Sequence, residues 1–256
     1  MSKRILVIPD PQCAPGLPTE HLSWAGKAIM EYKPDVIVHI GDHWTMDSIS
    51  SYASRKDLEG ARYKEDIDAG TEGMDRLLEP MRRFNQRRAK NKKAQYKPRM
   101  VFCLGNHEQR IQRTIQDNPQ FDGWLNYPDD LPLDDWEVYG FREPVEIEGV
   151  LFSHYFYSPN SGRPYGGTAL SKLKNIGNSF VMGHQQGLDY ALRQTPNGKL
   201  QHGLVAGSFY LHDEDYRGPQ ANNEWRGIVM LNDVHDGDFD VMFLRMDYLR
   251  RKYGKG

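Results

Sequence analysis

The sequence predicts an α/β sandwich built from two mixed β-sheets, and three observations support this fold class. The amino-terminal half alternates short aliphatic runs with stretches whose apolar residues recur at helical spacing. The carboxy-terminal half is rich in strand-like segments with few helices between them, which favours a more antiparallel second sheet. Several aliphatic runs also end in polar side chains, as strands do at the edge of a sheet where ligands bind.

Three buried strands are expected in the first half, because each of the following ranges contains a run of apolar residues: 5–8, 35–42 and 99–106. Three helices are expected from apolar residues that share one face: residues 19–32, 61–88 and 108–116. Pro80 could kink or split the second of these helices, because proline removes a backbone hydrogen bond inside a helix.

The second half begins with two short strands on either side of Gly149, within residues 145–154. A helix is expected at residues 168–176. The remaining strand-like segments are residues 179–184, 203–209, 227–234 and 239–246.

Composition limits the class of protein. The 256 residues contain no linker-like stretch and no composition break, so we expect a single domain over residues 1–256. Hydrophobic residues make up 38% and the formal net charge is −2, which describes a folded chain that is not a polycation. The two cysteines form no CxxC motif, and the first apolar run is too short for a signal peptide or a membrane span. We therefore expect a cytoplasmic protein with no membrane partner; its oligomeric state stays open.

Five of the predicted strands end in polar residues of related chemistry. These tips are Asp10 with Gln12, Gly41-Asp42, Gly105-Asn106-His107, Ser153-His154, and Gly183-His184 with Gln186. Glycine before three of the tips would let the backbone turn sharply and expose the next side chain. One such tip alone is more often an ordinary turn residue. Carboxylate, amide and imidazole groups gathered at one edge suit divalent ions such as Mn²⁺, Fe²⁺ or Zn²⁺, and two such ions can clamp the oxygens of a phosphate ester.

The order of these tips resembles the calcineurin-like metallophosphoesterase superfamily, whose pattern is DxH, GD, GNH[DE], a later His and GHxH. The corresponding stretches here are DPQ (10–12), GD (41–42), GNHE (105–108), SH (153–154) and GHQQ (183–186). The resemblance covers residues 4 to about 210 and implies a four-layer α/β/β/α sandwich of two mixed β-sheets. The motifs are also similar to those of phosphoesterases encoded by bacteriophages, which would place the protein in a host cytoplasm.

The resemblance implies a role for each motif residue. Asp42 would bridge two metal ions and Asp10 would bind the first of them. The second ion would be completed by Asn106, His154 and His184. His107 would not bind metal; with Asn106 and Asp42 it would form the catalytic set. It would stabilise the transition state and protonate the leaving oxygen, or keep a neighbouring water or phosphate in place. We expect Glu108 to orient an adjacent imidazole.

Two histidines of the family pattern are glutamines here, Gln12 and Gln186, and both would bind the first metal. An amide oxygen is a weak ligand that favours harder ions. Three interpretations remain open, because the first site could hold Mn²⁺ or Mg²⁺ loosely, fill only when substrate supplies phosphate oxygens, or stay empty. We favour a Mn²⁺-dependent enzyme with one strong and one weaker site, with Mg²⁺, Fe²⁺ and Zn²⁺ as alternatives.

The implied activity is hydrolysis of a phosphate ester, in which metal-bound hydroxide attacks phosphorus in line and His107 assists the leaving group. Residues 82–99 carry nine Lys or Arg and no acid, which favours phosphodiesters in a nucleotide, DNA or RNA, although a solvated helix face explains them equally simply. One alternative is a phosphomonoesterase or protein phosphatase, but GDHWTMD lacks the GDxxDRG of protein phosphatases. Another is a non-catalytic metal-binding module with a weakened first site. His43, His202 and His212 are further candidates near the site, and residues 158–167 could form a lid.

Overall fold

The side chains of the first strand point alternately into two separate hydrophobic cores. In the computed structural model, which describes residues 2–54, 56, 58–213 and 223–254, the first aliphatic run is β1 (Lys3–Ile8). Leu6 and Ile8 pack in a core beneath helices, whereas Ile5 and Val7 pack in a second core that faces the other sheet. A strand segment that is buried on both faces has to be aliphatic, as residues 5–8 of this strand are.

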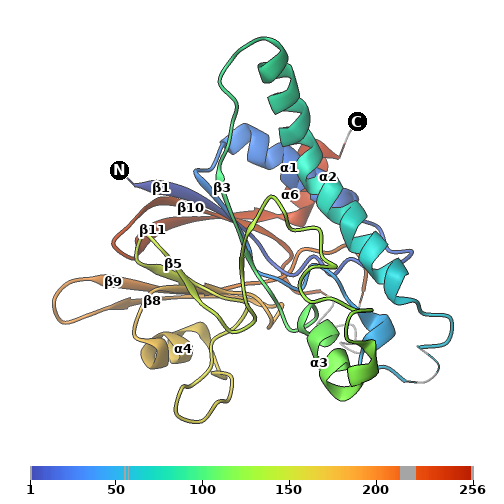
Figure 1. Ribbon diagram of the computed structural model, residues 1–256. Coiled ribbons are helices and arrows are strands. Elements are labelled where there is room, and N and C mark those ends of the chain that lie inside the picture. Colours follow the sequence, from blue (N-terminus) through green and yellow to red (C-terminus); the bar gives the residue numbers. More distant parts are fainter. Residues whose placement is uncertain (1, 55, 57, 214–222, 255–256) are drawn as a thin grey trace.

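The first sheet has the strand order β11-β10-β1-β2-β3-β4 (Figure 1). Its parallel strands are β1, β2 (Val36–His39), β3 (Arg99–Cys103) and β4 (Glu137–Tyr139). Two antiparallel strands extend it beside β1, namely β10 (Gly227–His235) and β11 (Asp238–Arg245). The last two strand-like segments of the chain therefore return to the first sheet.

The second sheet has the order β5-β6-β7-β9-β8. Its strands are β5 (Val145–Ile147), β6 (Val150–Phe152), β7 (Phe180–Met182), β8 (Leu188–Gln194) and β9 (Leu200–Ala206). β6, β7 and β9 are parallel, and the edge strands β5 and β8 are antiparallel. Both sheets are therefore mixed.

Helices cover the outer faces of the two sheets. α1 (Glu20–Tyr32), α2 (Tyr63–Lys90) and α6 (Met246–Tyr253) lie on the first sheet, and α4 (Ala169–Ile176) lies on the second (Figure 1). A third core lies between α4 and the second sheet, around Leu173 and Phe180. Together with the two cores on either side of the first sheet, it confirms the predicted four-layer sandwich. Three shorter elements are α3 (Gln109–Asp117), η1 (Asp47–Ile49) and η2 (Pro119–Phe121).

The structure differs from the sequence expectations in a few elements. Of the two expected effects of Pro80, a kink or a split of the helix, the split does not occur, because α2 continues through Pro80. The Pro80 ring instead packs where α1 and α2 approach closely, because a Cβ on Gly26 of α1 would lie 2.9 Å from Pro80 Cγ and 2.4 Å from the Leu77 carbonyl oxygen. β4, β8 and α6 are not predicted by the sequence patterns. β4 is largely exposed and β8 is mostly half-buried, so neither has a continuous apolar run.

Candidate metal centre

The polar tips converge because they follow the carboxyl ends of parallel strands. β1, β2 and β3 of the first sheet are parallel to one another, and so are β6 and β7 of the second. Contacts across the two sheets join their ends: His154 Nε2, after β6, lies 3.2 Å from Asp42 Oδ2, after β2. The backbone N–H of His184, after β7, donates to Asp10 Oδ2, after β1 (2.9 Å). All five predicted tips therefore lie at one edge of the sandwich.

Four side chains form a compact group of possible metal ligands. One atom each from Asp42, His154 and His184 lies within 4.8 Å of the others. Asn106 Oδ1 lies between the two imidazoles, 2.9 Å from His154 Nε2 and 2.8 Å from His184 Nδ1. Two imidazole nitrogens, a carboxylate and an amide oxygen form a mixed donor set that suits Mn²⁺, Fe²⁺ or Zn²⁺.

His154 is oriented by the strand beside it. Its Nδ1 lies 2.7 Å from the Ile40 carbonyl oxygen, and a carbonyl can only accept, so Nδ1 carries a proton and Nε2 faces the group. Burial alone would lower the pKa of His154, but the Asp42 carboxylate, its hydrogen bond and Asp10 raise the pKa to about 10.

Asp10 lies next to this group and has an unpaired oxygen. Its Oδ1 is buried with no hydrogen-bond partner among the described residues, and His154 Nδ1 is 3.9 Å away. Burial raises the pKa of Asp10 well above its usual range, and the Asp42 charge adds to this effect. A buried carboxylate oxygen without a donor fits the edge of a cation site.

The two glutamines differ from the other motif residues in their surroundings. The Tyr210 hydroxyl donates to Gln186 Oε1 (3.0 Å), so the amide oxygen that would have to bind a metal already has a protein partner. Gln12 is 1% exposed, and its Nε2 has no hydrogen-bond partner among the described residues. Gln186 therefore already uses its amide oxygen in a protein contact, whereas the buried amide nitrogen of Gln12 has no acceptor among the described residues.

Five predicted site residues have left-handed backbones, which non-glycine residues rarely adopt. Their φ angles are 39° at Asp10, 46° at Gln12, 47° at Asp42, 67° at His184 and 60° at Gln186. Each such conformation costs about 1–3 kcal/mol and persists only where the surrounding structure holds it. The direction of these side chains is therefore set by a strained backbone conformation that the surrounding structure holds in place.

The motif glycines serve two purposes. Gly41 has φ 86°, so it turns the backbone as expected. Gly105 and Gly183 do not have positive φ and are needed for close approach. A Cβ on Gly105 would lie 2.2 Å from Asp42 Oδ1, and one on Gly183 would lie 2.3 Å from Asp10 Oδ1. The absence of a side chain at these positions lets the carboxylates enter the centre.

Glu108 binds backbone groups with both of its oxygens. Oε1 accepts from the N–H groups of His43 (2.7 Å) and Trp44 (3.2 Å), and Oε2 accepts from those of Asp42 (3.0 Å) and Gly105 (2.7 Å). The expectation that Glu108 orients an imidazole is wrong, because the adjacent loop of the GD motif occupies it. Burial and the Asp42 charge raise the pKa of Glu108 to about 7, while the four N–H groups favour its ionised form.

His107 lies between Asp42 and an arginine that the motif analysis does not identify. Its backbone N–H donates to Asp42 Oδ1 (2.9 Å), and its Nε2 is 3.7 Å from Asp42 Oδ2 and 3.2 Å from Arg110 Nη2. A guanidinium only donates, so Nε2 accepts and the imidazole is neutral. Burial lowers the pKa of His107, and Arg110 adds to this against the opposing effect of Asp42.

Arg110 is fixed on its other side by the loop after Asp42. Its Nη1 donates to the Thr45 carbonyl oxygen (2.6 Å) and to Asp47 Oδ1 (3.1 Å). The signal for Arg110 was present in the sequence, because it follows His107 by three residues at the start of a predicted helix, a spacing that places two side chains on one face.

The remaining candidate histidines have structural partners. His39 Nδ1 accepts from the Gly41 N–H (3.2 Å), His39 Nε2 then donates to His43 Nδ1 (3.0 Å), and His43 Nε2 donates to the Gly70 carbonyl of α2 (2.8 Å). His202 contacts Tyr190 (2.8 Å) and Asp238 (2.6 Å), away from the four-ligand group. His212 stacks on Tyr210, with ring centroids 4.5 Å apart.

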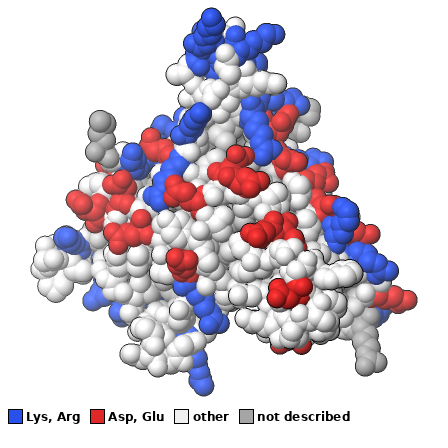
Figure 2. Space-filling model, in the orientation of Figure 1, with Lys and Arg blue, Asp and Glu red and all other residues white. Residues whose placement is uncertain are grey.

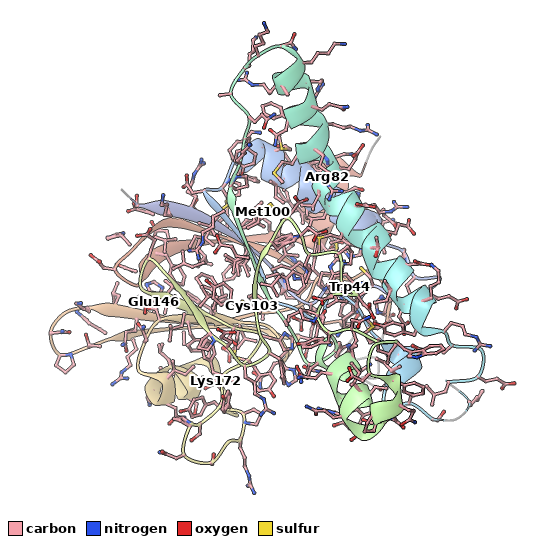
Figure 3. The ribbon with its side chains drawn as sticks, in the orientation of Figure 1. Trp44, Arg82, Met100, Cys103, Glu146 and Lys172 are labelled. Atoms are coloured by element: carbon pink, nitrogen blue, oxygen red, sulfur yellow. The ribbon has the colours of Figure 1, made fainter. Side chains whose placement is uncertain are left out.

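The turn that carries His184 and Gln186 is supported from α4. Lys172, labelled in Figure 3 beside α4, is fully buried, and its Nζ donates to Gln185 Oε1 (2.8 Å) and to the Gly167 carbonyl. Tyr155 packs against the His184 ring of the same turn, with the two ring centroids 4.8 Å apart. The second sheet and its helix thus fix this part of the centre.

The basic stretch at residues 82–99 lies at the opposite end of the first sheet from the centre. It leads into the amino end of β3, and Tyr96 donates to the Pro34 carbonyl before the amino end of β2 (2.6 Å). In Figure 3, Arg82 lies toward the Met100 end of β3 and away from Cys103. Figure 2 shows Lys and Arg gathered around the carboxyl end of α2. Three of the nine basic residues pair with acids: Arg82 with Asp75 and Asp135, Arg83 with Glu79, and Arg99 with Glu137.

Comparison with known proteins agrees with the geometry. The sequence profile of the family described as Calcineurin-like phosphoesterase matches residues 3–243. No curated protein matched the chain. Similar solved structures include a Streptococcus pneumoniae protein described as a predicted phosphoesterase, with 14% identity, TM-score 0.35, and coverage of 96% of this chain and 91% of that one. A Thermus thermophilus protein has 9% identity, TM-score 0.35, and coverage of 95% and 99%. In the described part of the chain, no helix has the length and apolar character needed to cross a bilayer.

Proposed function

Because the chain belongs to the calcineurin-like phosphoesterase family, we propose that it is a metal-dependent hydrolase of phosphate esters that prefers phosphodiesters. The observation that carries this proposal is the convergence of two imidazoles, an amide and a carboxylate at one sheet edge. The unpaired Oδ1 of Asp10 beside them supports a bound cation.

The strong metal site would use Asp42, Asn106, His154 and His184. Its mixed oxygen and nitrogen ligands favour Mn²⁺, with Fe²⁺, Zn²⁺ and Mg²⁺ as alternatives. A divalent ion at these residues would supply activation of water for attack on phosphorus and neutralisation of charge on the phosphate. The remaining motif residues Asp10, Gln12 and Gln186 would form at most a weaker site, since both glutamines replace stronger histidine ligands.

His107 is assigned to the leaving group. It lies against Asp42, and its imidazole is held by the Arg110 guanidinium at 3.2 Å. Arg110 would place its positive charge next to the leaving oxygen. The His107 imidazole would assist the departure of that oxygen through one of its ring nitrogens. Asp42 and Asn106 complete this catalytic set. Both contact His154, and Asn106 also contacts His184.

Charge balance at the centre favours a diester over a monoester. One divalent ion offsets the two carboxylates of Asp10 and Asp42, and the charge of Arg110 is shared with Asp47 at 3.1 Å. Little net positive charge then remains for a dianionic monoester, whereas a diester carries one negative charge only. A nucleotide or a nucleic-acid strand provides such a diester. The basic stretch gives this preference little support, because it lies at the far end of β3.

Two other functions remain as candidates, each with a feature that argues against it. A phosphomonoesterase or protein phosphatase would need more positive charge at the centre. A non-catalytic metal-binding module would not need His107 and Arg110 next to Asp42. We further propose a single domain over residues 1–256 in the cytoplasm, that of a host cell if the protein is encoded by a bacteriophage, as its motifs suggest.

Hydrolysis of bis-p-nitrophenyl phosphate and p-nitrophenyl phosphate by the Mn²⁺-loaded protein tests the proposal. We expect faster turnover of the diester, and we expect His107→Ala and Asp42→Ala to abolish it. Preference for the monoester would identify a phosphatase instead. Turnover that survives Asp42→Ala, or a protein that binds no Mn²⁺, would contradict a metal-dependent hydrolase.

A further inference from the structure

We propose that the part of the centre formed by Asp10, Gln12 and Gln186 holds no second metal ion and instead uses the Gln12 amide to donate a hydrogen bond to a phosphate oxygen. This inference rests on the proposed function, because it concerns how the same centre binds its substrate. It replaces the expected unequal pair of ions with one ion and one hydrogen-bond donor.

The first step concerns Gln186, whose amide oxygen is the only atom of that side chain able to bind a cation. The Tyr210 hydroxyl donates to this oxygen at 3.0 Å, and Tyr210 is fully buried. Tyr210 is itself fixed, because the Arg226 guanidinium lies 4.3 Å from its ring centroid and donates to its carbonyl oxygen at 3.3 Å. Gln186 therefore acts as a partner of Tyr210 and is poorly placed to serve as a ligand.

The second step concerns Gln12, which lies beside Asp42 because its backbone N–H donates to the Asp42 carbonyl oxygen at 3.0 Å. Its side chain is 1% exposed, and Nε2 has no acceptor among the described residues. A buried donor without an acceptor costs about 1–3 kcal/mol, so its retention points to an acceptor that arrives with a ligand. A phosphate oxygen is such an acceptor, and a metal ion is not, because an amide nitrogen offers no electron pair.

The third step is the number of ligands. Apart from the weak amide oxygen of Gln12, a first ion would have only the Asp10 carboxylate and a share of Asp42, which also accepts from the His107 N–H. Ions of the zinc type normally have at least three protein ligands in a stable site, and an ion with fewer depends on water and substrate oxygens for the rest. The second site, by contrast, has two imidazoles and two oxygens within reach. The donor set therefore fits one resident ion.

The ion count is tested by loading the full chain with Mn²⁺, removing loosely held metal, and measuring manganese by mass spectrometry together with the electron paramagnetic resonance spectrum. We expect one ion per chain and the hyperfine pattern of an isolated ion. The Gln12→His/Gln186→His/Tyr210→Phe variant restores both histidines and removes the competing hydroxyl. We expect it to hold two ions with an exchange-coupled spectrum. Two coupled ions in the unmodified protein would overturn the proposal. No bound ion would overturn the proposed function as well, so the two failures are distinguishable.

The role of Gln12 is tested by titrating inorganic phosphate into the Mn²⁺-loaded protein in a calorimeter. Gln12→Met keeps the size of the side chain and removes the amide, so we expect phosphate to bind about tenfold more weakly with the manganese content unchanged. Gln86→Met on the exposed face of α2 is the matched control and leaves the affinity as it was. Gln12→Glu, which removes the donors by a different route, serves if Gln12→Met does not fold. Unchanged phosphate affinity in a folded Gln12 variant would overturn the proposal.

Discussion

Among single residues, Glu108 supports the centre without contacting a ligand atom, because its two carboxylate oxygens accept hydrogen bonds from backbone N–H groups. It ties four N–H groups of two loops together, and one of these loops carries Asp42. The motif GNHE identifies Glu108 in the sequence, but its partners lie 64 to 66 residues away at Asp42, His43 and Trp44. The role of Tyr210 could not be predicted from the sequence either, because its contact with Gln186 depends on how β7 and β9 pair. Sequence spacing reveals ligands within one motif but not the partners that fold in from elsewhere.

Replacing Glu108 by Gln tests this role. A glutamine keeps the size but directs an NH₂ group at two backbone donors, leaving them unpaired at about 1–3 kcal/mol each. We expect the free energy of unfolding to fall by about 2–4 kcal/mol and Mn²⁺ to bind about 10–100-fold more weakly. Urea unfolding and calorimetric titration with Mn²⁺ measure the two effects. Glu72→Gln, which removes one exposed pair with Arg76, is the control and should change stability by less than about 0.5 kcal/mol. Equal effects from both substitutions would show that the four hydrogen bonds do not stabilise the centre.

His21 makes the stability of the protein sensitive to acid. Burial lowers the pKa of His21 from its ordinary value to about 3, and the neighbouring His43 and His212 act in the same direction. Because the unfolded chain binds a proton near pH 6.5 and the folded chain does not, the contribution of His21 is present above that pH and is lost as pH falls toward 3. We expect this residue to remove about 1.4 kcal/mol of stability per pH unit in that range.

Urea unfolding at a series of pH values between about 7 and 4 measures this slope. The His21→Leu variant should lose stability less steeply with falling pH than the unmodified protein, by about 1.4 kcal/mol per unit. Leu170→Ala, at an exposed residue of α4 that does not titrate, is the control and should keep the original slope. Parallel slopes for the His21 variant and the unmodified protein would show that the folded state accepts a proton at this position.

At the scale of elements, the buried strands and amphipathic helices could be predicted because burial on one or both faces leaves a periodic pattern. β1 and β3 are aliphatic or aromatic along most of their length, and α1 keeps its apolar residues on one face. The sheet that each strand joins could not be predicted, since nothing local separates β10 from β9. The continuity of α2 through Pro80 also depends on tertiary packing against Gly26. Patterns report burial, but the pairing of strands depends on the whole chain.

The junction between β3 and α3 allows a comparison of two glycines with different roles. A Cβ on Gly105 would lie 2.2 Å from Asp42 Oδ1, so Gly105→Ala must displace that carboxylate. We expect Mn²⁺ affinity to fall at least about tenfold, as it does when groups that orient a metal ligand are lost. Gly177 ends α4 with φ 76° and has open space around its Cα, so Gly177→Ala should cost about 1 kcal/mol of stability. Calorimetric titration with Mn²⁺ should leave the Gly177 variant unchanged. A loss of Mn²⁺ affinity in both variants would mean that general destabilisation, and not a clash with Asp42, weakens the centre.

For the whole molecule, parallel pairing separates two features that are close in sequence. The polar tips lie at the carboxyl ends of β1, β2 and β3, and the basic stretch at residues 82–99 lies at their amino ends. In the sequence the stretch leads directly into the strand that precedes Gly105, so order along the chain alone would place it near the site. The direction of that strand places the two at opposite ends of the sheet. Only the fold, and not the order of the motifs, could reveal this separation.

Charge reversal in the basic stretch therefore should leave the chemistry unchanged. At an ionic strength of about 0.1 M the Debye length is about 10 Å, so charges at the far end of the sheet are screened from the centre. We expect Arg87→Glu/Lys93→Glu to change kcat/KM for bis-p-nitrophenyl phosphate by less than about twofold. Arg110→Ala, which removes the guanidinium at His107, should lower the same kcat/KM by about tenfold or more.

Cleavage of a single-stranded oligonucleotide, used as a second substrate, tests whether the basic stretch binds a nucleic-acid strand. If the double reversal slows cleavage of the oligonucleotide alone, and more so at low salt, the stretch binds the strand at a distance from the centre. If it slows both substrates as much as Arg110→Ala does, the stretch reaches the centre and the separation inferred from strand direction is wrong.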